Sequence, residues 1–417
     1  MWHGQAIAPE AALGQLAALI AAGRNDPPGR ILAIASPRAS LETNFALRQL
    51  AGADRFYAAL RPGEMVLAKR ILALQQHWPS PSLRQIETCD AVLILGEDVS
   101  NVAARLALSL RQSLRQQPLR EISDPLHIPR WLDHAAREAT QDAHGPLFIA
   151  TPAATRLDEL AARCFRAAPA DLARLGFAVA HALDATQPDA SEWTAPAGEI
   201  ARALLTAERP LVIAGMSSGS AETIEAAAAV RSALAARGHA AELSLLVPDC
   251  NTLGLALLDP LPLEDGLEMS RHTDLAVVAE ADVFRCAPPD AAGRFCAHFR
   301  DGRSLVVLDE IRHATSDAAA LLLPAAGVFH GDGTLVSQEG RAQRFFRVFE
   351  PNPNIREAWR WLVQAQGQDP TLDEMTATVA ATHPLLAAIA SAAPPAGFRR
   401  AGQKIAQETH RFSGRTA

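Results

Sequence analysis

A short turn in the middle of the sequence combines residue types that nucleophilic catalysis requires. Gly215-Met216-Ser217-Ser218-Gly219 reads as G-x-S-x-G, follows an apolar run and precedes a helical pattern. Small residues on both sides of a serine allow the strained strand-to-helix turn that exposes a nucleophile. Asp309, at the end of a later apolar run, and either His313 or His330 would complete the Ser, Asp, His order of an α/β-hydrolase.

The same turn has two simpler interpretations. Some glycine-serine turns at this place in a doubly wound sheet hold phosphate at a helix N-terminus, whereas others are only tight turns. Because the pattern is short, it leaves a nucleophile, a phosphate contact and a plain turn all open.

A second glycine-rich stretch lies between residues 331 and 341. Gly331, Gly333 and Thr334 belong to the run GDGT, and Glu339, Gly340 and Arg341 form the run EGR. Two glycines two positions apart let the backbone approach something bulky, and their N–H groups can face a phosphate or a packed carbonyl. Glu339 and Arg341 also suit an ion pair that ties a loop to the core.

The cysteines and histidines form no metal-binding pattern. The sequence has no CxxC, HxxH or HExxH spacing, whereas zinc and iron-sulfur sites normally take neighbouring ligands from one turn. We expect reduced thiols, packed as small apolar groups, at Cys89, Cys164, Cys250, Cys286 and Cys296.

Length and composition indicate a globular protein of two or three domains. The chain has 417 residues, of which 49% are hydrophobic and 20% charged. Its net charge is −7 and it has no long basic run, so we expect no nucleic-acid partner. The apolar positions between 11 and 22 predict an amphipathic helix, and no apolar run is long enough to span a membrane. We therefore expect a cytoplasmic protein.

Strand patterns alternate with helix patterns, which implies an α/β fold with right-handed crossovers and parallel sheets. The predicted strands are 31–35, 56–60, 91–95, 147–150, 211–214, 243–247, 275–278 and 305–308. The predicted helices run from the cap at Ser40 to Leu50, then 65–76, one long helix after residue 98, 156–165, 221–237 and about 359–363. Residues 185–197 are the clearest linker.

The order of motifs in this chain resembles the molybdopterin oxidoreductase family. LLLPA, GDGT and EGRAQRFF resemble the segment with which that family re-enters its pterin-binding domain, most closely as found in the G-subunit family of bacterial NADH-quinone oxidoreductase (respiratory complex I). Four further stretches resemble the same G-subunit family: ILAIASPRASLETNFALRQLAG, AVLILGEDVSNVAARLALSLRQ, IPRWLDHAAREATQDAHGPLFIATPAATRLDELA and FRRAGQKIAQETHRFSGRTA. They are spread in one order over nearly the whole chain.

The resemblance implies two doubly wound, mostly parallel-sheet α/β lobes of the molybdopterin oxidoreductase type, one inserted in the other. Residues 1–60 and 196–345 would form the first lobe and residues 61–195 the inserted lobe. Residues 346–417 would form a helical segment and a basic tail.

The resemblance also implies a vestigial cofactor region. In the family, a pterin dinucleotide is held by groups that correspond here to Gly215, Gly219, Gly331, Gly333, Thr334, Glu339, Gly340 and Arg341. The asparagine that usually separates the threonine from EGR is missing, since Ser337 and Gln338 stand there, and a serine hydroxyl offers less than an amide that both donates and accepts. The start of the inserted lobe, Arg61 to Met65, lacks the usual Cys, selenocysteine or Ser metal ligand.

The G-subunit family is regarded as a branch that kept the fold and lost the molybdenum. The resemblance therefore implies a scaffold section without catalytic residues, cofactor or metal, in a complex that transfers electrons from NADH to quinone. Iron-sulfur clusters would lie in N-terminal domains of the subunit that are missing here, and the partners would be other peripheral-arm subunits on the inner face of the bacterial plasma membrane. An active molybdopterin-binding oxidoreductase and a serine hydrolase using Ser217 stay as alternatives.

Overall fold

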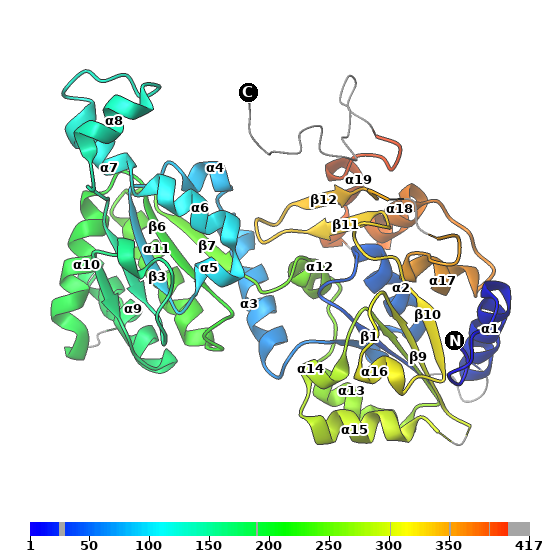
Figure 1. The fold of residues 1–417 in the computed structure, drawn as a ribbon. Helices are drawn as coiled ribbons and strands as arrows, with labels where there is room; N and C mark the ends of the chain where they lie inside the picture. The colour runs from blue at the N-terminus through cyan, green and yellow to red at the C-terminus, as the bar shows by residue number, and fades with distance from the viewer. Residues whose placement is uncertain (25–29, 189–190, 301, 350–351, 383, 399–417) are drawn as a thin grey trace. The chain divides into compact units, whose positions relative to one another are not determined.

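The chain folds into two compact units. The computed structural model describes residues 1–24, 30–188, 191–300, 302–349, 352–382 and 384–398 (Figure 1). Unit 1 comprises Met1–Pro62, Gly254–Ser337 and Arg341–Ala417, and unit 2 comprises Gly63–Leu253 and Gln338–Gly340. Unit 2 is therefore an insertion into unit 1. Residues 338–340, which lie much later in the sequence, also belong to unit 2.

Unit 1 is built on a parallel sheet of five strands in the order β10-β9-β8-β1-β2. The strands are β1 (Ile31–Ala35), β2 (Phe56–Ala58), β8 (Leu275–Ala279), β9 (Ser304–Asp309) and β10 (Leu321–Pro324). Their apolar runs are buried, as expected for strands covered on both faces. The strand order reverses between β1 and β8, and in such sheets ligands bind beyond the carboxyl ends of the strands at this point.

Helices cover both faces of the unit 1 sheet. On one face, Leu32, Ile34 and Val278 form a buried core with Phe295 of α15. On the other face, α2 packs on β1, and its N-terminus is capped where the side chain of Ser40 accepts the N–H of Thr43. The helices are α1 (Pro9–Arg24), α2 (Leu41–Ala51), η1 (Ala53–Arg55), α13 (Leu263–Met269), η5 (Ser270–His272), α14 (Val283–Cys286), α15 (Pro289–His298), α16 (Ala314–Asp317), α17 (Ala358–Gln364), α18 (Leu372–Thr382), η6 (Pro384–Leu386) and α19 (Ile389–Ala392).

The glycine-rich stretch forms an antiparallel hairpin. Its strands are β11 (Gly333–Val336) and β12 (Ala342–Phe345), with Thr334 opposite Arg344. Both strands belong to unit 1, whereas the residues at the turn, 338–340, belong to unit 2.

Unit 2 is built on a second parallel sheet, in the order β5-β4-β3-β6-β7. Its strands are β3 (Ala91–Leu95), β4 (Leu147–Ala150), β5 (Arg163–Phe165), β6 (Pro210–Gly215) and β7 (Glu242–Leu246). The strand order reverses between β3 and β6, which pair directly.

The helices of unit 2 also form a layer on each side of the sheet. Val92 and Ile94 of β3 pack with Leu106 and Leu110 of α6, while Leu95 points to the other face, toward Gly176 of α9. The helices are α3 (Glu64–His77), α4 (Leu83–Ile86), α5 (Val99–Val102), α6 (Ala104–Ser113), α7 (Gln116–Pro118), η2 (Leu119–Ser123), α8 (Asp133–Thr140), η3 (Asp158–Leu160), α9 (Pro169–Leu183), η4 (Ser191–Trp193), α10 (Thr194–Thr206) and α11 (Ala221–Ala236). Helix α12 (Thr252–Leu257) contains the boundary between the units.

The predicted α/β fold with two doubly wound parallel sheets is confirmed, but the insertion ends at Leu253 and not at 195. Strands β6 and β7, predicted to belong to the first lobe, pair with β3 and complete the unit 2 sheet. Of the predicted linker at 185–197, residues 191–193 form η4 and residues 194–197 begin α10, inside unit 2. Residues 61 and 62 belong to unit 1, and 338–340 belong to unit 2.

Two helix predictions also need correction. Residues 156–165 form η3 and the edge strand β5, because Cys164 and its neighbours pair with β4. The long helix after residue 98 is interrupted at Ala103, between α5 and α6. The predicted basic tail lies mostly outside the described residues, since only its first residue, Phe398, is described.

Candidate functional site

Glu97 and the Gly215–Gly219 turn meet where the strand order of unit 2 reverses. Glu97 follows β3 and Ser217 follows β6, and these two strands are neighbours. Oε1 of Glu97 accepts the backbone N–H of Ser217 at 2.8 Å, and Oε2 accepts its hydroxyl at 2.6 Å. The hydroxyl of Ser217 thus donates to a buried carboxyl group.

The pKa of Glu97 lies far above its ordinary value. Its side chain is almost fully buried, and this burial raises the pKa to about 7, although the two hydrogen bonds from Ser217 oppose the shift. Glu97 therefore changes its charge near neutral pH.

We expect this shift to make the stability of unit 2 depend on pH. Since the folded pKa of Glu97 is raised, the stabilisation by its neutral form is complete below about pH 4.5 and is lost as the pH rises through about 7. A shift of this size corresponds to about 3 kcal/mol. Glu97→Gln should remove this part of the dependence, measured by hydrogen exchange of the β3 and β6 amides at pH 5 and pH 8 after correction for the intrinsic pH dependence of exchange.

The control for this prediction comes from unit 1. Burial, followed by the carboxylates of Asp309 and Glu310, raises the pKa of Glu280 to about 8, whereas Arg38 lowers it. Glu280→Gln should leave the amide exchange of β3 and β6 unchanged at both pH values. An unaltered pH dependence of that exchange in Glu97→Gln would contradict the assignment to Glu97.

Gly215 is needed because the turn packs closely on its neighbours. A Cβ atom at this position would lie 2.4 Å from the carbonyl oxygen of Leu246 and 2.5 Å from Oε1 of Glu97. Both contacts are far shorter than any real Cβ contact. Gly215 therefore has a packing role that needs no bound phosphate.

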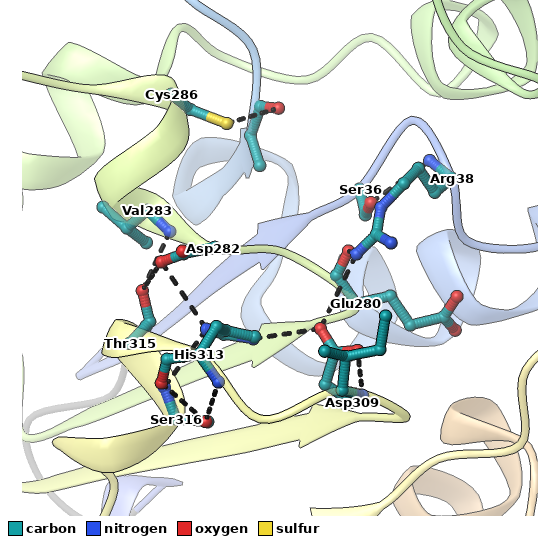
Figure 2. A network of polar contacts seen from close by, with 12 residues as sticks. Ser36, Arg38, Glu280, Asp282, Val283, Cys286, Asp309, His313, Thr315 and Ser316 are labelled. Carbon is teal, nitrogen blue, oxygen red and sulfur yellow. Dashed lines mark hydrogen bonds and ion pairs between the residues drawn. The ribbon is translucent and has the colours of Figure 1, made fainter.

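A polar network occupies the corresponding edge of unit 1 (Figure 2). Arg38 follows β1, and its Nη2 donates to the backbone carbonyl of Glu280, after β8, at 2.6 Å. The same Nη2 lies 3.7 Å from Oδ2 of Asp309, the last residue of β9. Glu280 has a φ of 54°, an uncommon conformation for a residue with a side chain. The network holds three strand ends together.

His313 is the second link in this network (Figure 2). Its Nε2 lies 3.1 Å from Oδ2 of Asp309, and its Nδ1 accepts the N–H of Ser316 at 3.3 Å while lying 3.5 Å from Oδ1 of Asp282. Nδ1 thus faces the Ser316 amide and Nε2 faces the carboxylate of Asp309. Both ring nitrogens are used within the loop, so neither serves as a base for a serine.

The structure does not bring the predicted hydrolase residues to one sheet. Ser217 follows β6 in unit 2, whereas Asp309 and His313 lie at the end of β9 in unit 1. His330 lies 3.9 Å from Glu310, also in unit 1. An α/β-hydrolase places all three members at the carboxyl edge of a single sheet.

The GDGT part of the hairpin is attached to α2 by a buried carboxylate. Oε2 of Glu42 accepts the backbone N–H of Thr334 at 2.9 Å, and Oε1 lies 2.9 Å from the hydroxyl of Thr376 in α18. Glu42 and Thr334 are both fully buried. This amide does not fit the phosphate of a dinucleotide, because the group already facing it is an acidic side chain.

Gly333 is required because there is no room for a side chain at this position. A Cβ atom there would lie 2.7 Å from the ring of Phe345 and 2.8 Å from Cβ of Ser40. At Gly331 the nearest atom would be Cγ of Glu357, at 3.0 Å. The GDGT run thus packs closely against other residues of the chain.

The EGR part lies at the turn of the hairpin. Oε1 of Glu339 accepts the N–H of Leu83 at 3.3 Å, and Gly340 has a φ of 71°, which favours glycine. The carbonyl oxygen of Arg341 accepts the N–H of Ser337 at 2.9 Å, which closes the turn. Gly219, with a φ of 65°, closes the other predicted turn.

The eight predicted site residues are divided between the two units. Gly215, Gly219, Glu339 and Gly340 belong to unit 2, whereas Gly331, Gly333, Thr334 and Arg341 belong to unit 1. Within unit 2, Gly215 and Gly219 share the turn after β6, while Glu339 contacts the N-terminus of α4.

Sequence reasoning assigned no function to the three carboxylates that organise these regions. Glu97 lies two residues after the buried strand β3 and Glu280 directly after β8, and acidic groups at strand ends are a detectable signal. Glu42 lies in the first turn of a helix, where an acidic residue is ordinary, so its burial gave no signal.

The cysteines do not gather. Cys89 and Cys296 are buried, and burial raises the pKa values of their thiols to about 12 and about 11. Cys164 and Cys250 are exposed, so the expected packing holds only for some of the five. In the part of the chain that the structure describes, no three His, Cys, Asp or Glu side chains are arranged to hold a metal ion.

Comparisons with known proteins identify homologues over nearly the whole chain. The G subunit of NADH-quinone oxidoreductase from Pseudomonas fluorescens is 46% identical over 435 aligned residues, covering 100% of this chain and 47% of that protein. The G subunit from Escherichia coli (strain K12) is 40% identical, covering 93% of this chain and 44% of that protein. The chain thus spans about half the length of the curated relatives that it matches. No family model matches it.

A solved structure shares the fold. A chain of the formyltransferase/hydrolase complex from Methylorubrum extorquens, solved with methylofuran, has a TM-score of 0.58 and 15% sequence identity. The match covers 88% of this chain and 97% of that chain. Within the described residues, no helix is both long and apolar enough to cross a membrane.

Proposed function

The chain is homologous over nearly its whole length to one section of the G subunit of NADH-quinone oxidoreductase, and we propose that it is a scaffold section of that subunit. The observation that carries the proposal is the 46% identity with the Pseudomonas fluorescens protein over the full chain. In this function the complete subunit transfers electrons from NADH toward quinone, and this section stabilises the assembly without a redox centre of its own.

The site geometry supports a non-catalytic function for the section. The amide of Thr334, which would face a pterin phosphate, donates to Glu42, and the hydroxyl of Ser217 donates to Glu97. These two donors are thus engaged by internal hydrogen bonds. An electron relay needs a metal centre with its own ligand set, and the described residues supply no such cluster.

The partners follow from the same proposal. The section contacts other subunits of the peripheral arm of the complex, on the cytoplasmic side of the bacterial inner membrane, and it reaches the membrane only through them. The iron-sulfur clusters are carried by other parts of the complete subunit.

Ser217→Ala in the complete subunit tests the proposal. Because Ser217 only donates to Glu97, we expect assembled complex with NADH–quinone turnover unchanged within about twofold. The variant loses hydrogen bonds in unit 2, so the amount of complex is measured first and turnover is expressed per complex. A large loss of turnover per complex would assign Ser217 a catalytic function and contradict the proposal.

A further inference from the structure

One nitrogen atom of His313 lies within reach of two groups that need opposite things from it. Nδ1 lies 3.3 Å from the backbone nitrogen of Ser316, whose N–H needs an acceptor, and 3.5 Å from Oδ1 of Asp282, which needs a donor (Figure 2). An unprotonated Nδ1 accepts from Ser316, whereas a protonated Nδ1 donates to Asp282. Because one atom cannot do both, the two contacts exclude each other.

The other ring nitrogen faces the same partner in both cases. Nε2 lies 3.1 Å from Oδ2 of Asp309, whose side chain is 3% exposed. A buried carboxylate accepts and never donates, so a proton on Nε2 suits this contact whether or not Nδ1 also carries one. Protonation of Nδ1 therefore turns His313 into an imidazolium between the carboxylates of Asp282 and Asp309.

Opposing electrostatic effects act on the ring of His313. The side chains of His313 and Asp282 are 12% and 14% exposed, so water screens their interaction only in part. Two carboxylates favour a positive ring, whereas the start of α16 and Arg38, 3.7 Å from Oδ2 of Asp309, oppose it. The titratable groups on the neighbouring elements are Glu280 after β8, Arg285 and Cys286 of α14, Cys296 of α15, and Glu310, Arg312 and Asp317 around α16. Of these, Cys286 donates to Ala59, Glu310 lies near His330, and Arg312 pairs with Asp317.

The start of α16 keeps its other contacts in either state. The backbone N–H of His313 donates to Oγ of Ser316 at 2.8 Å, and that hydroxyl donates to the carbonyl oxygen of His313 at 2.7 Å. Oδ1 of Asp282 also accepts the hydroxyl of Thr315 at 2.7 Å. The Ser316 N–H is the group that gains or loses an acceptor. Because Ser316 is buried, bulk water does not replace that acceptor fully.

We propose that His313 is a protonation switch at the start of α16. In the neutral state, Nδ1 caps the helix by accepting the N–H of Ser316. In the protonated state, Nδ1 releases Ser316 and the ring bridges Asp282 and Asp309, which joins the segment after β8 to the end of β9. The switch uses residues of unit 1 alone, so it does not rest on the proposed function.

Solution NMR of the whole chain tests the switch. With ¹⁵N in histidine and serine, the ring nitrogens of His313 and the amide of Ser316 are followed in one sample from about pH 5 to about pH 9. As the pH falls, we expect Nδ1 to take up a proton while Nε2 stays protonated. Over the same pH range the Ser316 amide proton should shift to lower frequency, because it loses its acceptor. A Ser316 amide that does not follow Nδ1, or an Nδ1 that keeps one state throughout, overturns the proposal.

Removal of one carboxylate gives the matched test. Asp282→Asn keeps the shape and an oxygen acceptor for Thr315, but removes the charge that faces Nδ1. It should move the midpoint of the Nδ1 titration to lower pH by about one pH unit. Asp290→Asn makes the same chemical change at an exposed position of α15 and should leave the midpoint unchanged. Equal midpoints in the two variants contradict the proposal.

A variant that cannot be protonated separates the switch from other pH effects. His313→Asn keeps a side chain that caps helices, so the Ser316 amide should stay constant over the whole pH range. A Ser316 amide that still titrates in this variant responds to another group, which overturns the assignment to His313. Thermal unfolding shows whether each variant is folded, and the titration of the unaltered chain decides the question where a variant is not.

Discussion

Gly215→Ala should unfold or severely destabilise unit 2, by about 3 kcal/mol or more. The new methyl group would lie 2.4 Å from a backbone carbonyl of β7 and 2.5 Å from the carboxyl group of Glu97. The carbonyl cannot move without breaking the pairing of β6 with β7, so the strain is not relieved by a change of rotamer. Hydrogen exchange of the β6 and β7 amides, followed by mass spectrometry, measures the loss directly.

Gly198→Ala is the matched control for this change. Gly198 lies within α10 of the same unit, and a Cβ atom there would meet no heavy atom within 4 Å. Since alanine favours a helix interior over glycine, the control should be neutral or stabilising by up to about 1 kcal/mol. Equal protection of β6 and β7 in Gly215→Ala and in the control would show that the turn does not pack as described.

Glu42→Ala should destabilise unit 1 by about 3 kcal/mol. The change leaves the buried N–H of Thr334 without its acceptor and opens a cavity beside α18. It also removes the carboxylate beside the hydroxyl of Thr376, which accepts from Nη2 of Arg344 at 3.3 Å; the side chain of Arg344 is 2% exposed. Urea unfolding at pH 7 measures the change in the free energy of unfolding.

Two controls separate charge, shape and simple loss of a carboxylate. Glu42→Gln keeps the shape and one oxygen acceptor, so we expect a loss of about 1 to 2 kcal/mol, smaller than that of Glu42→Ala. Glu10→Ala removes an exposed carboxylate at the start of α1 and should stay within about 0.5 kcal/mol. A Glu42→Ala protein as stable as Glu10→Ala would show that Glu42 does not attach the hairpin to α2.

Local sequence patterns were sufficient for most of the parallel strands. The apolar runs at 31–35, 91–95 and 275–278 became β1, β3 and β8 because a strand buried on both faces needs a continuous apolar run. The cap at Ser40 also placed the start of α2 correctly, since a cap depends on neighbouring residues only.

The errors concern pairing between distant segments. Edge strand β5 has two exposed residues among three, so it lacks the apolar run that marks a central strand. The end of the insertion depends on β6 pairing with β3 across more than a hundred residues, and no local pattern in β6 specifies that partner. The polar loop before α10 had the composition of a domain linker but connects two helices of one unit.

At the candidate site, too, the local sequence pattern does not specify which distant residues a position contacts. The glycines at 215, 333 and 340 were found by their spacing, but the atoms that require them, in Leu246, Phe345 and the turn itself, come from other strands or from the backbone conformation. The same glycine pattern serves a bound phosphate or a packed neighbour equally well. Only the buried acceptor Glu42 distinguishes the two interpretations at Thr334.

Cofactor content tests the scaffold function most directly. The purified chain, checked for cooperative unfolding, is analysed for iron and molybdenum by elemental analysis and for pterin by fluorescence after oxidation. We predict less than about one tenth of an equivalent of each, because the groups that would hold the pterin are engaged by Glu42 and Glu97. Molybdenum and pterin in amounts close to that of the protein would contradict the scaffold function and make the hairpin a working cofactor site.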